Sequence, residues 1–483
     1  MVYDILKTLP FWILGLGGVL VFILESFLKK GWPRSTVTAV ISLLAGLSAI
    51  YFRAFYVDGS TAFNGQIYVD SLTLFTTLLI TLATTLVVFL SSNRLDIEQI
   101  ESKGEYYGLM LIATAGAILF CNARDFICLF LGLEILSMAI YCLCGSCLER
   151  RESSESAMKY FLLGSFSSAF FLYGLTLLYG LTGSLIIPEV AGAITGVDQN
   201  LMLLAMGFVI FGFAFKVGLA PVHFWVPDVY QGAPTSVTAF MATVVKVSAV
   251  TAFLRVLWGI FGVQIEDWSK LIWVLALVTI VAGNLLALRQ RNVKRMLAYS
   301  SIAHAGYMLC AFLFPSNSFS GGSAVLFYLV SYVLVSIGAF GVLMSLNSDH
   351  GTKYDVSSFY GLSSKKPFLA FSFTFFLLAL AGLPPGMAGF VGKFYVFGSA
   401  VSAGYIGLSI IAMLASTVSC YYYLRVIVAM YFMNSSNSEE SITTLSSIQV
   451  GVLTCCLILS VGLGVFPQVI YDFTSSVSSS LSK

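Results

Sequence analysis

Long apolar runs, separated by short polar or charged segments, recur along the whole of this chain. A transmembrane helix needs about 20 mainly apolar residues, and the hydrophobic pattern divides into fourteen runs of roughly that size. They span residues 10–28, 35–55, 69–92, 106–122, 125–147, 156–181, 201–220, 234–260, 268–288, 296–314, 321–346, 367–399, 403–432 and 447–470. The first run is followed by lysines and an arginine, without a small-residue cleavage motif, which is typical of a first span rather than of a removed signal. The pattern predicts an all-α polytopic membrane protein of about 14 transmembrane helices.

Composition supports this class and excludes others. The chain has 483 residues, of which 58% are hydrophobic and 10% are charged, whereas soluble domains carry about 25% charged residues. Lys and Arg total 25 against 23 for Asp and Glu, and no basic tail is present, so nucleic acid is not expected as a partner. No loop is long enough to bury a core of its own. We therefore expect residues 1–483 to form a single integral membrane domain.

Basic residues are distributed unevenly between the two sets of loops. Those following odd-numbered spans hold Lys29, Lys30, Arg34, Arg94, Lys103, Arg150, Arg151, Lys159, Arg289, Arg291, Lys294, Arg295, Lys353, Lys365 and Lys366. The opposite set holds only Lys7, Arg53, Arg124, Lys270 and Lys483. Because short cytoplasmic loops are enriched in Lys and Arg, both termini are expected on the non-cytoplasmic side.

Two predicted spans contain proline or glycine breaks beside a lysine. Lys216 precedes Pro221 in the seventh span, and Lys393 follows the stretch LAGLPPGMAGFVG in the twelfth. Irregular backbone at membrane depth is tolerated where protein or water covers it, and broken helices in corresponding halves indicate a transport site. The spacing predicts two related units with discontinuous helices 7 and 12. We assign 1–105 to N-terminal helices, 106–260 to a first repeat, 268–432 to a second repeat and 447–483 to a C-terminal helix.

Four ionisable side chains fall near the centres of predicted spans, namely Glu134, Lys216, Lys246 and Lys393. A central charge costs about 2.5–3.5 kcal/mol on insertion scales, so such residues usually face a cavity or one another. A structural ion pair is one alternative, and a protonated Glu134 among apolar side chains is another. One carboxylate cannot neutralise three lysines, which favours neutral or water-solvated amines that pass protons.

Two histidines have functional and structural interpretations. His304 lies on a polar stripe of an otherwise apolar helix, with Ser300 and Ser301 one turn before it and Tyr307 one turn after it. It is interpreted as a proton relay, with a hydrogen-bonded structural histidine as the alternative. His223, near the break in the seventh span, fits a relay and a cap equally well.

Three basic residues lie toward span ends. Lys159 begins the sixth run, where an interfacial position and a relay role are both open. Arg255 and Arg425 are expected to reach the membrane surface with their long side chains.

Cofactor motifs are missing from the chain. Cys142, Cys144 and Cys147 in CLCGSC have no second cysteine pair nearby to complete a four-ligand site. The chain has no glycine-rich nucleotide loop, no phosphate-binding loop and no histidine cluster. We expect no metal and no redox cofactor in this chain, so the energy for proton movement would come from a gradient or from partner subunits.

Several long motifs resemble one family. The stretch KVGLAPVHFWVPDVYQGAPTSVTAFMATVVKVSAV at 216–250 resembles the antiporter-like membrane subunits of proton-pumping NADH:quinone oxidoreductase, respiratory complex I. The stretches VKRMLAYSSIAHAGYML at 293–309, LAGLPPGMAGFVGKFYVF at 380–397 and YYYLRV at 421–426 are similar to the N-subunit branch, also called subunit 2. A lysine at 393, where a sibling branch carries glutamate, supports this assignment.

The resemblance implies fourteen helices, two inverted five-helix repeats and a proton-translocating function. In the family, the residue matching Glu134 pairs with the one matching Lys216, and residues matching Lys246, His304 and Lys393 continue the relay with water. Lys159 matches a position near the glutamate.

The resemblance also implies the setting of this activity. NADH, FMN, iron-sulfur clusters and quinone would be bound by other subunits. The partners would be other membrane-arm subunits, of the antiporter-like and small K/J types, together with lipid of a bacterial inner membrane.

Two other functions remain open from the sequence. A multisubunit sodium/proton antiporter subunit would use the same lysines with a cation, and would transport sodium without an NADH-linked partner. A structural spacer of the membrane arm would conduct nothing, so loss of Lys216 or Lys246 would leave pumping intact.

Overall fold

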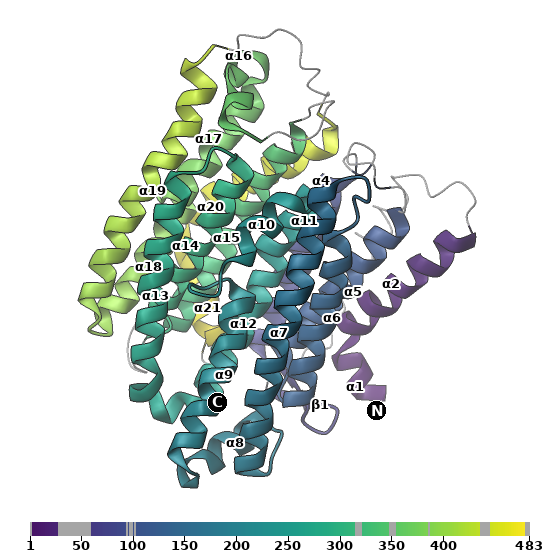
Figure 1. The fold of residues 1–483 in the computed structure, drawn as a ribbon, viewed down its shortest axis with the longest axis vertical. Helices are drawn as coiled ribbons and strands as arrows, with labels where there is room; N and C mark the ends of the chain where they lie inside the picture. The colour runs from purple at the N-terminus through teal and green to yellow at the C-terminus, as the bar shows by residue number, and fades with distance from the viewer. Residues whose placement is uncertain are drawn as a thin grey trace.

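Long helices, packed side by side, form nearly all of the molecule (Figure 1). The computed structural model describes residues 2–27, 59–92, 95, 100, 103–313, 321–346, 354–384, 387–434 and 445–478. Its helices are α1 (Val2–Lys7), α2 (Leu9–Phe27), α4 (Ser71–Ser91), α5 (Lys103–Asn122), α6 (Phe126–Cys144), α7 (Arg151–Thr182), α8 (Ile187–Ala193), α9 (Gln199–Val217), α10 (Trp225–Gly232), α11 (Thr235–Phe240), α12 (Lys246–Phe261), α13 (Ile265–Leu288), α14 (Val293–Cys310), α15 (Gly321–Ser345), α16 (Leu362–Lys365), α17 (Pro367–Ala381), α18 (Met387–Ser402), α19 (Ile406–Phe432), α20 (Ser447–Val465) and α21 (Pro467–Ser478).

Shorter elements complete the chain path. Single helical turns are η1 (Ile194–Gly196), η2 (Met241–Val245), η3 (Gly262–Gln264) and η4 (Val356–Phe359). The strands β1 (Ser60–Ala62) and β2 (Ile67–Val69) form an antiparallel hairpin in which Ser60 faces Val69. This hairpin lies with α1 and α8 at the lower end of the bundle in Figure 1.

The helices agree with the predicted all-α membrane fold. In the described part of the chain, ten helices are long and apolar enough to cross a membrane. Every predicted span except 35–55 coincides with a helix or with two or three consecutive helical segments. The range 35–55 lies outside the described residues, so the count of fourteen stays a prediction.

Polar caps fix where several helices begin. Asp125 accepts a hydrogen bond from the backbone N–H of Cys128 at the start of α6, with an N–O distance of 2.6 Å. Asn292 accepts one from the N–H of Arg295 at the start of α14, at 3.0 Å. Such side chains satisfy N–H groups that lack a partner in the first helical turn. The polar residues between the apolar runs thus define the helix boundaries.

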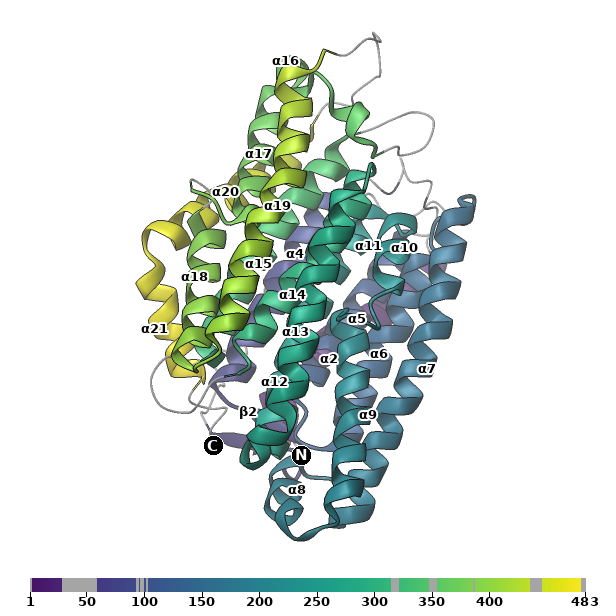
Figure 2. The same cartoon turned by 60° about the vertical axis from the view of Figure 1, so that its left-hand side comes forward.

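The two predicted breaks are present. Helix α9 ends at Gly218, with φ of 84°, and α17 ends at Gly382, with φ of 79°, a left-handed conformation that glycine adopts without strain. In Figures 1 and 2, α9 lies below α10, whereas α17 lies above α18. The two broken helices therefore run in opposite directions, as an inverted repeat requires.

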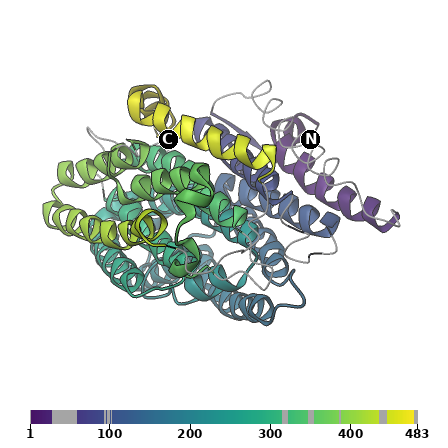
Figure 3. The ribbon, with the colours of Figure 1, turned by 90° about the horizontal axis from the view of Figure 1, so that it is seen from above.

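One continuous helical span occupies the centre of the bundle. It runs through α11, η2 and α12 and is buried along its whole apolar stretch, whereas α7, α19 and α20 each leave most of theirs uncovered. Helix α20 contacts α4, α15 and α18, and α21 contacts α4 and α15. The C-terminal helices thus run back toward the N-terminal part, as Figure 3 shows from above.

Candidate functional site

Lys216 lies in the last turn of α9, directly before the first break, and is buried. Its Nζ donates hydrogen bonds to Ser137 Oγ at 2.8 Å and to Tyr160 OH at 3.3 Å. The same Nζ lies 5.5 Å from the centre of the Tyr160 ring, within the range of a cation–π contact. Lys216 therefore joins α9 to α6 and α7 through neutral oxygens.

Lys246 lies at the centre of the bundle, where α12 begins. The preceding turn η2, Met241–Val245, is π-helical, a local widening that changes side-chain direction and is frequent at functional sites. Lys246 Nζ donates to both the carbonyl oxygen and Oγ of Ser301 in α14, at 2.5 Å each. It also lies 5.2 Å from the ring centre of Tyr332.

Lys393 lies in α18, beyond the second break. Its Nζ donates to the carbonyl oxygen of Ala381, the last residue of α17, at 2.7 Å and to Ser416 Oγ at 2.8 Å. It lies 5.1 Å from the ring centre of Tyr307. The lysine thus occupies the C-terminal end of the first half-helix, where unpaired carbonyls carry partial negative charge.

His304 lies in α14 among tyrosine side chains. Its Nδ1 lies 2.6 Å from the hydroxyl of Tyr328, and its Nε2 lies 3.5 Å from the hydroxyl of Tyr423. Its ring centre lies 5.7 Å from that of Tyr307 and 5.2 Å from that of Tyr332. Because Lys246 lies over the Tyr332 ring and Lys393 over the Tyr307 ring, His304 is linked to each of these two lysines through one tyrosine.

Glu134 does not form the expected ion pair with Lys216. Lys216 binds Ser137 instead, one helical turn after Glu134 on α6, and none of the ion pairs within 4.0 Å in the described residues involves Glu134. The Oε1 atom of Glu134 is buried without a hydrogen-bond partner. Glu134 and the serine that binds Lys216 therefore belong to the same turn of α6, but the carboxylate and the lysine form no ion pair.

Lys159 does not contact Glu134 either. Its Nζ lies 2.8 Å from Glu155 Oε1 and 2.9 Å from Asp228 Oδ2, and its side chain is 42% exposed. Asp228, in α10, also accepts from Arg295 Nη1 at 2.7 Å through its other oxygen. Lys159 is thus part of a polar cluster on the surface of the protein.

His223 lies in the segment between α9 and α10 and is buried. Its ring packs against that of Phe224 at 4.8 Å, and its Nδ1 is buried without a hydrogen-bond partner. The residue at the start of α10 receives no side-chain cap. The backbone carbonyl of His223 accepts from the N–H of Val226 in the first turn of α10, at 2.9 Å.

The prediction that Arg255 reaches the membrane surface was wrong. Arg255 is buried, and its two terminal nitrogens each donate to one oxygen of Asp70 at 2.7 Å. Its guanidinium also lies 4.6 Å from the ring centre of Tyr68. Arg425, by contrast, donates to backbone carbonyls of Leu288 and Gln290 at the end of α13.

Sequence reasoning missed the partners of the buried lysines. These partners come from segments that are remote in sequence from the lysines, so no spacing rule identifies them. They are Ser137, Tyr160, Ser301, Tyr332 and Ser416. Two further polar residues carried a local signal: Asp228 and Gln231 interrupt the apolar segment directly after the first break. An acidic residue in such a segment is the one local signal from which a cationic partner could have been inferred.

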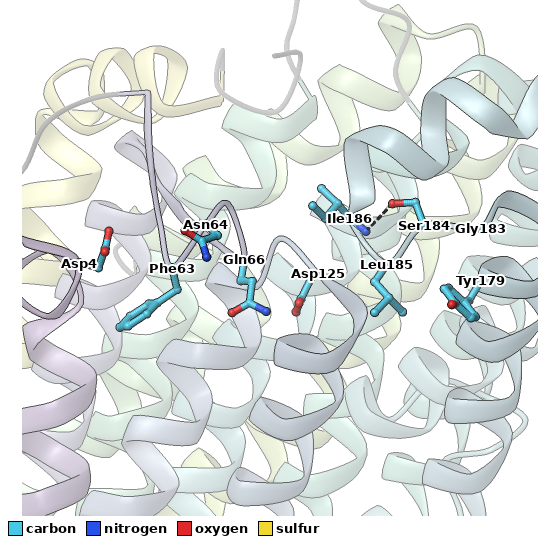
Figure 4. Close-up of a pocket in the computed structure, with 10 residues that line it drawn as sticks. All are labelled: Asp4, Phe63, Asn64, Gln66, Asp125, Tyr179, Gly183, Ser184, Leu185 and Ile186. Atoms are coloured by element: carbon cyan, nitrogen blue, oxygen red, sulfur yellow. Dashed lines mark hydrogen bonds between the residues drawn. The ribbon is translucent and has the colours of Figure 1, made fainter. Parts of the chain in front are cut away.

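One cavity of the structure is lined by none of these residues. It measures about 600 Å³ and is lined by Asp4, Phe63, Asn64, Gln66, Asp125, Tyr179, Gly183, Ser184, Leu185 and Ile186 (Figure 4). Asp125 caps α6 and Ser184 Oγ accepts from the backbone of Ile186, so polar groups here support the chain turns. In the described residues, no group of three or more His, Cys, Asp or Glu side chains could hold a metal ion.

Comparison with known proteins identifies the family. Residues 123–419 match the model of the family described as "NADH:quinone oxidoreductase/Mrp antiporter, TM". NADH-quinone oxidoreductase subunit N of Trichlorobacter lovleyi is 43% identical over 87% of this chain and 85% of its own. A chain of respiratory complex I from Thermus thermophilus is 35% identical, covers 96% of this chain and 98% of its own, and has a TM-score of 0.81.

A chain of the Mrp complex from a Dietzia species shares the fold, with a TM-score of 0.84 at 19% identity over 99% of this chain and 98% of its own. At this low identity, the structural match is evidence for the fold alone, whereas the N subunits also match this chain in sequence. The chain belongs to the family of antiporter-like membrane subunits of NADH:quinone oxidoreductases, and within it to the N-subunit branch.

Proposed function

We propose that this chain translocates protons as a membrane-arm subunit of an NADH:quinone oxidoreductase, through Glu134, Lys216, Lys246, His304 and Lys393. One observation carries the proposal. In the described part of the chain, the hydrogen bonds of Lys216, Lys246 and Lys393 go to hydroxyl and carbonyl oxygens, and none goes to a carboxylate.

Neutral partners suit a group that gains and loses a proton. A buried ion pair holds both charges in place, because removing one partner leaves an uncompensated charge at a cost of several kcal/mol. A hydroxyl oxygen accepts from an ammonium group and also donates to a neutral amine. The lysines can therefore change protonation state without losing their hydrogen-bonded neighbours.

The order of contacts suggests the path. Lys246 binds Ser301, which also accepts a hydrogen bond from Tyr332 at 2.9 Å. Tyr332 contacts His304 through its ring, and His304 in turn contacts the ring of Tyr307, over which Lys393 lies. Water completes the steps across ring contacts in this proposal, and histidine passes a proton from one nitrogen to the other.

Glu134 supplies the charge that modulates Lys216. It lies one turn from Ser137, the acceptor of Lys216, and its buried oxygen has no other partner. A movement of α6 that brings the carboxylate closer would favour the ammonium form of the lysine, and a movement away would favour the amine. His223, with a free buried nitrogen, is assigned a secondary relay role.

The relatives and the charge distribution support a proposal for the surroundings of this chain. The two inverted units are assigned to 106–260 and 268–432, each with one broken helix. NADH, FMN, iron-sulfur clusters and quinone belong to partner subunits, which supply the driving force, and this chain binds none of them. The chain lies in a bacterial inner membrane with both termini outside the cytoplasm, next to antiporter-like and small membrane-arm subunits.

The test uses Lys216→Ala and Lys246→Ala in the assembled oxidoreductase. Electron input and proton movement are measured together in sealed membrane vesicles, with Lys270→Ala, an exposed site on α13, as control. We expect normal assembly with lost proton pumping and slower quinone reduction in both buried variants.

Other outcomes would favour the alternative functions. Full pumping by both variants would make the chain a structural spacer. Sodium-dependent transport by the isolated membrane subunits, without an electron donor, would make it part of a cation/proton antiporter.

A further inference from the structure

Asp228 connects two helices that flank the first break. It lies in α10, and its two carboxylate oxygens bind Lys159 of α7 at 2.9 Å and Arg295 of α14 at 2.7 Å. The Asp228 side chain is 34% exposed, and ion pairs at such exposure contribute little to stability. These ion pairs therefore matter more for the relative positions of α7, α10 and α14 than for the stability of the fold.

On the α7 side, the residue next to Lys159 in the sequence contacts Lys216. Tyr160, adjacent to Lys159, is fully buried, and its hydroxyl accepts from Lys216. Its ring stacks on Trp225, with centres 4.4 Å apart and planes inclined by 9°. Trp225 begins α10, one helical turn before Asp228, so α7 and α10 are joined at the surface and again beside Lys216.

On the α14 side, the cluster is connected to the environment of Lys246. Arg295 precedes Ser301 by six residues, which is about 9 Å along a helix at 1.5 Å per residue. Ser301 is the acceptor of Lys246. Arg295 also donates to Gln231 Oε1 at 3.0 Å, which binds the same end of α14 to the last turn of α10.

We propose that Asp228 is a positioning residue that couples the two lysine sites, by holding the helices that carry the acceptors of Lys216 and Lys246 on either side of α10. The inference rests on the proposed function. A change in the first site that shifts Tyr160 is transmitted through Asp228 to α14, and so to Ser301.

The carboxylate is required because it accepts from two cations at once. An asparagine has one acceptor oxygen, and its NH₂ group points donors at a cation. Asp228→Asn therefore breaks one of the two bridges and leaves Lys159 or Arg295 without this partner. The remaining charged groups of the cluster are Glu155, which binds Lys159 within α7, and Lys294, which donates to the carbonyl of Ala233.

The experiment measures protons moved per electron in the assembled oxidoreductase. We expect Asp228→Asn to assemble normally and to lower this ratio several-fold, while Asp228→Glu restores it. Glu155→Gln is the matched control, because it removes a carboxylate from the same lysine without affecting α14, and should leave the ratio unchanged. If Asp228→Asn reduces the amount of assembled enzyme, Arg295→Gln tests the α10–α14 bridge alone, with the same expected loss.

Combined variants separate coupling from general damage. If Asp228 acts through Lys216, adding Asp228→Asn to Lys216→Ala slows quinone reduction no further than Lys216→Ala alone. A normal ratio in Asp228→Asn, or a slowing of quinone reduction that adds to that of Lys216→Ala, overturns the inference and leaves the proposed function standing. Full pumping by Lys216→Ala would instead overturn the proposed function.

Discussion

At the scale of single residues, buried lysines and the buried arginine have opposite surroundings. Arg255 is held by both oxygens of Asp70, whereas Lys216, Lys246 and Lys393 bind neutral oxygens and lie over tyrosine rings. Arginine stays protonated in proteins, while a buried lysine exchanges its proton readily. Arg255 therefore has a carboxylate bound to it, whereas none of the ion pairs among the described residues includes Lys216, Lys246 or Lys393.

Because a lysine releases its proton and an arginine does not, we expect that a positive charge at position 246 is not sufficient for proton pumping. Lys246→Arg keeps a cation but cannot release a proton, so we expect pumping to fall by about a hundredfold, the lower range for loss of a positioned proton-transfer group. Proton uptake by vesicles containing the assembled enzyme measures the effect. Lys270→Arg, on the exposed face of α13, should pump normally, and substantial pumping by Lys246→Arg would contradict a role in proton release.

The residues of the site were predictable from the sequence to different degrees. Lys216, Lys246, Lys393 and His304 stand out because charge within an apolar span is costly. Ser137 and Tyr160 did not stand out, because hydroxyl side chains are common in membrane helices and only the tertiary contact gives them a role. The expected contact between Glu134 and Lys216 is replaced by Lys216–Ser137, a difference of one helical turn that sequence spacing does not resolve.

At the scale of elements, each broken helix places a lysine at the end of a half-helix. Lys216 lies in the last turn of α9, and Lys393 donates to the last carbonyl of α17. The sequence predicted both breaks, since proline and glycine interrupt an apolar run only where the backbone leaves the helix. It did not predict that Ala220 N–H would donate to Thr279 Oγ1 at 3.0 Å, which satisfies a backbone group freed by the first break.

The glycine at the second break supports a prediction about lysine placement. Gly382 has a left-handed backbone, and an added Cβ would lie 2.7 Å from Lys393 Cδ. Gly382→Ala therefore combines backbone strain of about 1–2 kcal/mol with displacement of the lysine. We expect lower thermal stability and several-fold weaker pumping, measured on the same purified assembly.

Gly404 offers a matched control for that substitution. Its φ is 86°, but nothing lies within 4 Å of an added Cβ, so Gly404→Ala carries the strain without the clash. We expect a similar loss of thermal stability with normal pumping. Equal pumping by the two alanine variants would show that the space beside Lys393 is not needed.

At the scale of the whole molecule, the N-terminal part is joined to the central span by the Asp70–Arg255 pair. Asp70 caps α4 by accepting from the N–H of Thr73 at 2.7 Å, and Arg255 lies toward the end of α12. The pair is bidentate and buried, unlike the exposed cluster around Asp228. The sequence did not show this connection, because its two residues lie 185 positions apart.

This buried pair predicts how stability depends on one side chain. Removing one member of a buried pair leaves an uncompensated charge and costs about 3–5 kcal/mol, whereas replacing both with apolar residues is often neutral. Arg255→Met should therefore lower the thermal unfolding temperature of the purified assembly, and Asp70→Leu combined with Arg255→Met should recover most of it. An equally large loss in the double variant would mean that packing, and not charge, is responsible.

The same pair also gives stability a dependence on pH. Burial raises the pKa of the Asp70 carboxyl. The charge and hydrogen bonds of Arg255, together with the hydrogen bonds from Thr73, lower this pKa by more than burial raises it, so the pKa lies below the usual value. Since the unfolded chain has the higher pKa, about 3.9, the pair stabilises the fold above that pH, and this stabilisation is lost as the pH falls through the folded-state pKa. Thermal unfolding measured from neutral pH into the acid range should show this loss in the wild type. The double variant should lack that part of the acid dependence, because it has no carboxyl at position 70 to protonate, and an identical acid profile in both proteins would assign the acid sensitivity to other groups.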